Sequence, residues 1–164
     1  MKRLDNKVAI VTGASKGIGA GIANAFGAEG AAVVVNYAHD HKGAERVVRE
    51  ITGKGGRAIA VQGDVAQRSD AQRLVAEAKK AFGRLDVLVN NAGVFSFAPF
   101  EQFSEQEFHR QFNTNVLGMF LMTKPLCRPS GRKAAASSTS DRRPVSLPTR
   151  PFRSTWHQRA LLMA

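Results

Sequence analysis

Residues 12–19, which read TGASKGIG, decide the fold of this 164-residue chain. They end the apolar run KVAIVT at residues 7–12 and open a segment in which Ile18, Ile22 and Phe26 recur every four residues, the spacing of one helix face. A glycine-rich turn that joins a buried strand to the start of a helix is typical of a phosphate-binding loop. The alternative is a structural turn whose glycines are incidental.

The three glycines of this loop have separate expected roles. Gly13 permits a tight turn, Gly17 lets the backbone approach a pyrophosphate, and Gly19 allows the helix to pack closely. The helix N-terminus adds free N–H groups and a partial positive charge, both of which favour phosphate. The loop therefore predicts a dinucleotide site formed by Gly13, Ser15, Lys16, Gly17, Ile18 and Gly19.

Outward from the loop, strand-like and helix-like segments alternate as far as residue 124. The segments between the strands have the apolar periodicity of helices. Two pairs at helix starts, Ser69 with Gln72 and Ser104 with Glu107, indicate capping boxes. The alternation predicts an α/β fold, a Rossmann-type doubly wound parallel sheet. Apolar runs rich in branched side chains predict its buried strands at 7–12, 31–37, 57–61 and 85–89.

The end of the second predicted strand bears on which dinucleotide binds. A carboxylate there holds the 2′-hydroxyl of NAD, whereas a 2′-phosphate requires its absence and a nearby cation. Asn36 and Tyr37 end the strand without a carboxylate, and Lys16 lies in the glycine loop. We therefore favour NADP(H) over NAD(H) and place Asn36 and Tyr37 in the site. In the alternative, Lys16 is merely solvated and Asp40 or water serves the ribose.

Three further motifs follow the glycine loop in order: Gly63-Asp64-Val65, Asn90-Asn91-Ala92-Gly93 and Asn115-Val116-Leu117-Gly118. Together the four motifs resemble the short-chain dehydrogenase/reductase family, and within it the branch of 3-oxoacyl-(acyl carrier protein) reductases and glucose dehydrogenases. The resemblance covers residues 1–124 and implies an incomplete Rossmann-type sheet. It also implies hydride transfer between a nicotinamide cofactor and a small carbonyl or alcohol substrate.

The resemblance also implies roles for single residues. Asp64 and Val65 would lie against the adenine, and Asn115 would support the proton relay of the family. A strand-end cap at Asp64 and a buried asparagine that bonds backbone at position 115 stay open as alternatives. Phe95 and Phe97 are expected in the core rather than at a substrate pocket. The residues that would line the cofactor cleft are Asn91, Ala92 and Gly93.

The proton-transfer residues of the family are absent from the sequence. Family members use a serine and a Tyr-x-x-x-Lys pair, in which the tyrosine is the general acid/base and the lysine lowers its pKa. The one tyrosine here is Tyr37, on a different strand, and no Tyr-x-x-x-Lys occurs. We therefore expect little or no enzyme activity; the alternative is a catalytically dead nucleotide-binding module. The family commonly assembles as tetramers through helices near this region, which leaves the assembly of this chain open.

Charge and composition change at Lys124-Pro125. Of the net charge of +11, residues 1–124 carry +4 and residues 125–164 carry +7. The second segment has no apolar period and is predicted to be a disordered, basic, non-homologous tail. Its only aromatic side chains are Phe152 and Trp156, so nucleic-acid binding by the tail is a disfavoured alternative.

Composition excludes other classes of protein. The longest apolar runs fall far short of the roughly 18 residues that a membrane span requires. The first residues, MKRLDNKVAI, lack the apolar stretch of a signal peptide, so a cytoplasmic protein is expected. The single Cys127 permits no internal disulfide and no thiolate metal site, and no metal is expected.

The tail supports a further hypothesis, a one-base change of reading frame near Thr123–Pro125. Regrouped codons permitted by Lys133 to Pro144 encode Gly-Gly-Ser-Ile-Ile-Asn-Ile-Gly-Ser-Ala-Ala, and those across residues 154–159 encode Tyr-x-Ala-Ser-Lys. The hidden serine and tyrosine are thirteen codons apart, the separation found in the family. A shifted frame would account for both the missing residues and the basic tail.

Overall fold

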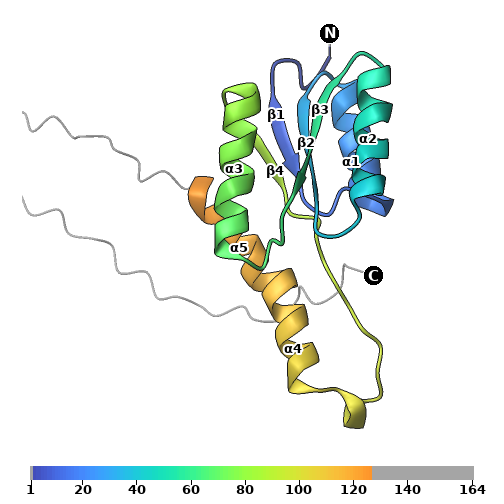
Figure 1. Ribbon diagram of the computed structural model, residues 1–164, viewed down its shortest axis with the longest axis vertical. Helices are drawn as coiled ribbons and strands as arrows, with labels where there is room; N and C mark the ends of the chain where they lie inside the picture. The colour runs from blue at the N-terminus through green and yellow to red at the C-terminus, as the bar shows by residue number, and fades with distance from the viewer. Residues whose placement is uncertain (1, 127–164) are drawn as a thin grey trace, which may run out of the picture. The chain divides into compact units, whose positions relative to one another are not determined.

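The computed structural model describes residues 2–126. These residues form a four-stranded parallel sheet in the order β3-β2-β1-β4 (Figure 1). Every strand end lies within two residues of its predicted place, and the predicted class, an α/β doubly wound parallel sheet, is confirmed. The strands are β1 (Val8–Val11), β2 (Ala32–Tyr37), β3 (Arg57–Gln62) and β4 (Val87–Val89).

β1 is an inner strand of the sheet and pairs on both sides. Ile10 lies opposite Val34 of β2 and opposite Leu88 of β4. All residues of β1 and β2 are buried, which explains why their sequences are nearly continuous apolar runs instead of alternating ones. Because the strands are parallel, their carboxyl ends meet at one edge, where the glycine loop begins.

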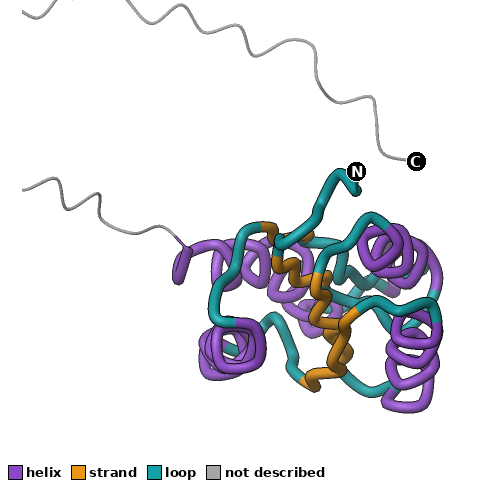
Figure 2. The backbone as a smooth tube through the Cα atoms, turned by 90° about the horizontal axis from the view of Figure 1, so that it is seen from above, coloured by secondary structure: helices purple, strands orange, loops and turns teal. Residues whose placement is uncertain are grey.

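Two pairs of helices cover the two faces of the sheet (Figures 1 and 2). The first pair packs with Val33 and Val35, and the second pair packs with Ile10 and Val34. Successive residues of β2 therefore point to opposite faces, as the pleat of a strand requires. The first pair is α1 (Gly17–Ala28) and α2 (His41–Gly53), and the second is α3 (Arg68–Phe82) and α5 (Gly118–Thr123).

The capping predictions succeed at one helix and fail at another. The Ser104 hydroxyl accepts from the backbone N–H of Glu107 at 3.2 Å and caps α4 (Glu105–Phe112), as predicted. The predicted cap at Ser69 is wrong, because α3 begins directly after Gln67 and Ser69 already lies in its first turn. An N-cap residue lies just before the helix and has a non-helical backbone; Gln67 occupies that position in α3, and Ser69 lies inside the helix.

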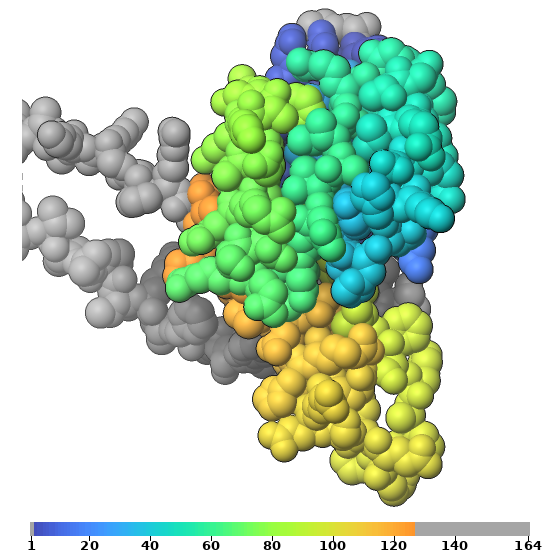
Figure 3. Space-filling model, in the orientation of Figure 1, coloured from blue at the N-terminus to red at the C-terminus, as the bar shows by residue number. Residues whose placement is uncertain are grey.

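Apolar side chains that follow β4 are largely exposed. The chain leaves β4 as an extended loop, passes the 3₁₀ turn η1 (Phe100–Gln102) and projects from the sheet with α4 (Figure 3). The core prediction for Phe95 and Phe97 is wrong: they are 75% and 95% exposed, because nothing within residues 2–126 covers this loop. An apolar stripe that runs from α4 into α5 is exposed as well. Its side chains are Phe108, Phe112, Val116, Met119 and Phe120.

The described residues end in the 3₁₀ turn η3 (Lys124–Leu126), which includes the first two residues of the predicted tail. The remainder of that tail, residues 127–164, lies outside the described residues. Within the part of the chain that the structure describes, no helix is both long and apolar enough to cross a membrane.

Candidate cofactor site

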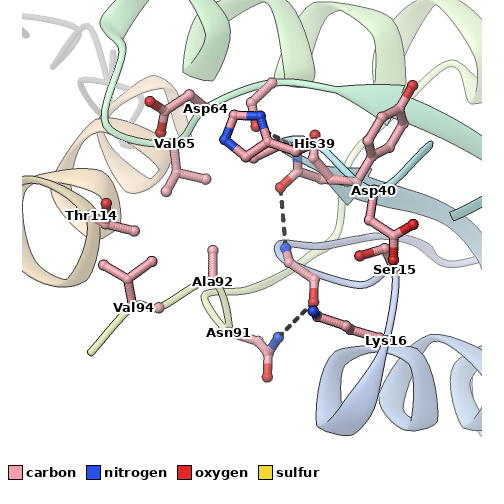
Figure 4. A pocket seen from close by; sticks show the side chains of 16 residues that line it. Ser15, Lys16, His39, Asp40, Asp64, Val65, Asn91, Ala92, Val94 and Thr114 are labelled. Carbon is pink, nitrogen blue, oxygen red and sulfur yellow. Dashed lines mark hydrogen bonds between the residues drawn. The ribbon is translucent and has the colours of Figure 1, made fainter. Parts of the chain in front are cut away.

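A cleft of about 470 Å³ opens where the carboxyl ends of the strands meet the glycine loop (Figure 4). In open α/β sheets, ligands bind at this edge, beside the point where the strand order reverses. β1 marks that point here, because β2 and β4 flank it on opposite sides. The cleft is lined by Gly13, Ser15, Lys16, Asn36, Tyr37, Ala38, His39, Asp40, Gly63, Asp64, Val65, Asn91, Ala92, Gly93, Val94 and Thr114.

The glycine loop turns sharply between β1 and α1. Gly13 and Gly17 have left-handed backbones, with φ of 62° and 59°, a conformation that favours glycine. A Cβ on Gly13 would lie 2.9 Å from the Cα of Ala92, so the loop approaches the turn after β4 too closely for a side chain. A Cβ on Gly17 would meet nothing within 4 Å, which leaves open space where a ligand can approach the backbone.

Side chains tie the turn after β4 to the glycine loop. The Thr12 hydroxyl, which is buried, accepts from the N–H groups of Asn91 at 2.9 Å and Ala92 at 3.0 Å. The Asn91 amide donates to the carbonyls of Thr12 at 2.9 Å and Gly13 at 3.2 Å. A Cβ on Gly19 would lie 2.5 Å from both Asn91 Nδ2 and the Gly13 oxygen. Gly19 therefore allows α1 to pack closely, as predicted, while the role of Thr12 was missed.

Asn36 fixes the glycine loop from the side of β2. Its Oδ1 accepts from the Gly13 N–H at 3.2 Å, and its Nδ2 donates to the Gly63 carbonyl at 2.9 Å and to Val61 of β3 at 3.3 Å. The side chain is only 1% exposed. Asn36 thus positions the loop against the end of β3. Tyr37, beside it, is buried at 8% exposed and still reaches the cleft wall.

The turn after β3 places Asp64 and Val65 on the cleft wall. The Asp64 carboxylate accepts from the Ala66 N–H at 2.9 Å, which is the strand-end cap considered as an alternative. Asp70, in the first turn of α3, accepts from the Asp64 N–H at 2.8 Å and from Arg73 at 2.9 Å. These hydrogen bonds, the one from the Asp64 backbone foremost, hold the pKa of Asp70 below its ordinary value.

We expect Asp70→Asn to lower the free energy of unfolding at pH 7. A carboxylate with a lowered pKa stabilises the fold above the pKa it has when unfolded, about 4, and that contribution disappears as pH falls through the lower folded value. The difference between the native chain and Asp70→Asn, measured by urea unfolding, should therefore narrow between pH 7 and pH 3. The control is Glu77→Gln, which removes an exposed pair with Lys80 at 3.8 Å and should have a small effect. A difference in unfolding free energy between the native chain and Asp70→Asn that stays constant with pH contradicts this account of Asp70.

Asn115 lies in a π-helical turn, η2 (Asn113–Leu117), between α4 and α5. Its Nδ2 donates to the Val94 carbonyl at 2.7 Å, and its Oδ1 accepts from the Val94 N–H at 2.8 Å. The reciprocal pair ties the segment leaving the Asn90–Gly93 turn to the helix. Asn115 does not line the main cleft but a small adjoining hollow, which it shares with Thr12 and Asn90. Its hydrogen-bond partners are backbone groups, as the alternative proposed, but the expected burial is wrong because the residue is exposed.

Asn115→Ala should release this segment while preserving the sheet. Loss of two partly exposed hydrogen bonds is expected to lower the free energy of unfolding by about 1 kcal/mol. Amide hydrogen exchange at Val94 should accelerate at least tenfold, because its N–H loses its acceptor. Asn113→Ala, an exposed amide on the same turn, is the control and should leave that rate unchanged. Equal protection of Val94 in the two variants contradicts the positioning role.

The structure brings together the loop, strand-end and turn residues that the sequence predicted, with a few exceptions. Gly17, Ile18 and Gly19 shape the first turn of α1 without lining the cleft, and the Ile18 side chain is 79% exposed. Asp40 lines the cleft, but its carboxylate accepts from the Gly43 N–H at 2.9 Å and caps α2. The only sign of this role in the sequence is an aspartate directly before a segment with helical periodicity. The lining residues that the sequence did not assign to the site are Ala38, His39, Gly63, Val94 and Thr114.

The fold, and the place of the cleft at the carboxyl ends of the strands, are those of the Rossmann-type α/β proteins. The family model of the short chain dehydrogenases matches residues 7–137, and the chain belongs to the short-chain dehydrogenase/reductase family. It is 55% identical over 131 residues to an uncharacterized oxidoreductase of Methylorubrum extorquens, covering 80% of this chain and 53% of the relative. It is 45% identical over 141 residues to versicolorin reductase 1 of Aspergillus parasiticus, covering 84% of this chain and 54% of the relative.

Solved structures of the same family resemble this one. A short chain dehydrogenase from Burkholderia cenocepacia in complex with NADP is 38% identical with a TM-score of 0.72, covering 74% of this chain and 50% of that one. A short chain dehydrogenase from Mycobacterium avium is 41% identical with a TM-score of 0.72, and the match covers 76% of this chain and 47% of that one. The chain thus spans about half the length of the relatives that it matches. The family match also continues beyond residue 124, where the sequence motifs end.

Proposed function

We propose that residues 1–124 form the cofactor-binding half of an oxidoreductase that transfers hydride between NADP(H) and a small carbonyl or alcohol. Residues 125–164 would be a tail, of which the family match covers residues 125–137. The observation that supports this proposal is the convergence of separate motifs on one cleft at the carboxyl edge of the sheet. The glycine loop, Asp64 and the Asn91–Gly93 turn all reach that cleft.

The residues present fit a nicotinamide dinucleotide, which would supply the hydride donor or acceptor. The backbone at Gly17 is open, and the first turn of α1 leaves N–H groups without intrahelical partners, so this region would hold the pyrophosphate. Asp64 and Val65 would hold the adenine end. Ala92 and Gly93 would line the path to the nicotinamide end, held in place by the Thr12 hydroxyl and the Asn91 amide.

NADP(H) is favoured over NAD(H) by the charges at the end of β2. No carboxylate ends that strand, and Lys16 lines the cleft. Asp40, the carboxylate that could have served a ribose hydroxyl, is engaged by the Gly43 N–H at the start of α2. The relative from Burkholderia cenocepacia binds NADP, which supports the same preference.

Turnover by this polypeptide is expected to be absent or very slow. The sequence has no Tyr-x-x-x-Lys pair, so no general acid stands ready to protonate a carbonyl oxygen. Asn115 could support a proton relay only if such a pair were present. The chain would then act as a nucleotide-binding module. We attribute the missing pair to a frame change near Thr123–Pro125. A coding sequence whose alternate frame does not encode Gly-Ser-Ile-x-Asn-Ile followed by Tyr-x-x-x-Lys would contradict that attribution.

The proposal is tested by binding and turnover assays on one preparation of the full chain. Titration with NADPH should change the cofactor fluorescence and saturate. Absorbance at the NADPH band should then stay constant when a panel of ketones and aldehydes is added. Consumption of NADPH that depends on a carbonyl substrate contradicts the inactivity, and absence of binding at about 1 mM NADPH contradicts the cofactor role.

A further inference from the structure

Three phenylalanines project from residues 95–100, a segment that we call the aromatic loop. Phe95, Phe97 and Phe100 are 75%, 95% and 91% exposed, more than any other phenylalanine within residues 2–126. Phe95 and Phe97 contact each other edge to face, with ring centroids 5.5 Å apart, and neither belongs to the apolar core on either face of the sheet. Figure 1 shows the loop leaving β4 and extending away from the sheet toward α4.

The backbone of the aromatic loop is accessible as well. Within the part of the chain that the structure describes, no N–H or carbonyl group of residues 95–98 makes a hydrogen bond. The chain is anchored on both sides: the Asn115 amide holds Val94, and the Ser104 hydroxyl caps α4. An exposed segment without backbone hydrogen bonds opens at almost no cost in free energy, and such segments are preferred sites of proteolytic nicking.

The sequence of the loop indicates which class of protease it suits. Between Arg84 and Arg110 the chain has no lysine or arginine, so a protease of trypsin-like specificity finds no bond to cut in residues 85–109. The three exposed aromatic side chains instead suit a protease whose primary pocket is a hydrophobic slot, as in chymotrypsin. Exposure of both the side chain and the adjoining backbone gives such a protease access to the bond after each phenylalanine.

We propose that the aromatic loop is a proteolytic processing site for an endopeptidase whose primary pocket accepts aromatic side chains, and that the nicked chain stays assembled. The inference goes beyond the proposed function and does not depend on it. In the reaction, one water adds across the peptide bond after a loop phenylalanine. The C–N bond breaks, the carbonyl carbon gains a hydroxyl and becomes a carboxylate, and the nitrogen gains a hydrogen and becomes an amine.

The piece that follows the cut is held on the sheet by α5. The Met122 side chain is fully buried in the core that also contains Leu74 of α3. Gly118 approaches Val65 so closely that a Cβ on the glycine would lie 2.8 Å from a Val65 methyl carbon. Burial of apolar surface does not require an unbroken loop, so these contacts should keep the two pieces together after the cut.

The first experiment treats the full chain with chymotrypsin at a low ratio of protease to protein and identifies the pieces by mass. The first N-terminal pieces should end at Phe95, Phe97 or Phe100, and their masses do not depend on cuts in residues 127–164. These cuts should be about a hundredfold faster than the cut after Phe120, which is 65% exposed but lies in α5. A helix must open before a protease can bind its backbone.

Variants test whether the loop phenylalanines direct the cut. In the triple variant Phe95→Gln, Phe97→Gln and Phe100→Gln, the three N-terminal pieces should disappear. Phe120→Gln is the matched control, since it removes an exposed phenylalanine from a helix and should leave these pieces unchanged. Circular dichroism confirms folding, which substitution of exposed side chains should preserve.

Size-exclusion chromatography of the nicked chain tests assembly. The N-terminal piece and the piece that carries α5 should elute in one peak and separate only in urea. A first cut within residues 2–126 that falls outside the aromatic loop overturns the processing site, as does a cut after Phe120 at a comparable rate. Persistence of the three N-terminal pieces in the triple variant also overturns it. Pieces that elute separately without urea overturn the assembled state.

Discussion

Asn36→Asp is expected to lower the free energy of unfolding at pH 8 by about 3 kcal/mol. The change is isosteric, yet it replaces an amide donor by a carboxylate that faces the carbonyls of Val61 and Gly63 in a site only 1% exposed. Burial beside two acceptors raises the pKa of the new carboxyl. The loss of stability should therefore shrink as pH falls toward 5, where a protonated carboxyl can donate again.

The control for this substitution is Gln72→Glu, the same chemical change at an exposed position near the start of α3. It should alter the unfolding free energy by no more than about 0.5 kcal/mol. Urea unfolding of both variants at pH 8 and pH 5 provides the comparison. A penalty for Asn36→Asp as small as that for Gln72→Glu contradicts the role of Asn36 in fixing the glycine loop.

Gly19→Ala should lower the unfolding free energy by about 2 kcal/mol and weaken NADPH binding at least tenfold. The new Cβ would lie 2.5 Å from the Gly13 carbonyl oxygen and 2.5 Å from Asn91 Nδ2. The first of these is backbone and cannot rotate away, so α1 or the glycine loop must shift. Either shift moves the N–H groups that we expect to hold the pyrophosphate.

Gly21→Ala, two residues further along α1, separates this clash from the general effect of adding a methyl group. Its Cβ would meet nothing within 4 Å, and alanine favours a helix over glycine. The variant should gain about 1 kcal/mol of stability and bind NADPH as the native chain does. Thermal unfolding and NADPH titration of the two variants side by side measure both effects. Equal stability and equal NADPH affinity of Gly19→Ala and Gly21→Ala would contradict the close-packing role of Gly19.

The glycine loop was predictable because its requirements are local. Gly13 needs a left-handed backbone, and a side chain on Gly19 would clash with the Gly13 carbonyl oxygen, so both requirements arise within the loop itself. The role of Asn36 was not predictable in the same way. Its partners lie up to 27 residues away, and only the pairing of β2 with β3 brings them within reach.

The wrong predictions, for Ser69, Phe95 and Phe97, also failed because residue type does not show which other elements surround a side chain. Ser69 is a good N-cap residue by type, but α3 begins one residue before it, after Gln67. Phe95 and Phe97 are apolar, and apolar type predicts burial only where another element covers the side chain. His39 carried no periodicity or motif, so the cleft alone identifies it.

The central claim is that a nicotinamide dinucleotide binds in the cleft at the carboxyl edge of the sheet. Amide chemical shifts of the ¹⁵N-labelled full chain, recorded during titration with NADPH, test it residue by residue. The account predicts saturable shifts at Gly13, Ser15, Asp64 and Gly93, with α3 residues such as Lys80 unaffected. Shifts that are absent at saturating NADPH, or that cluster away from the glycine loop, contradict it.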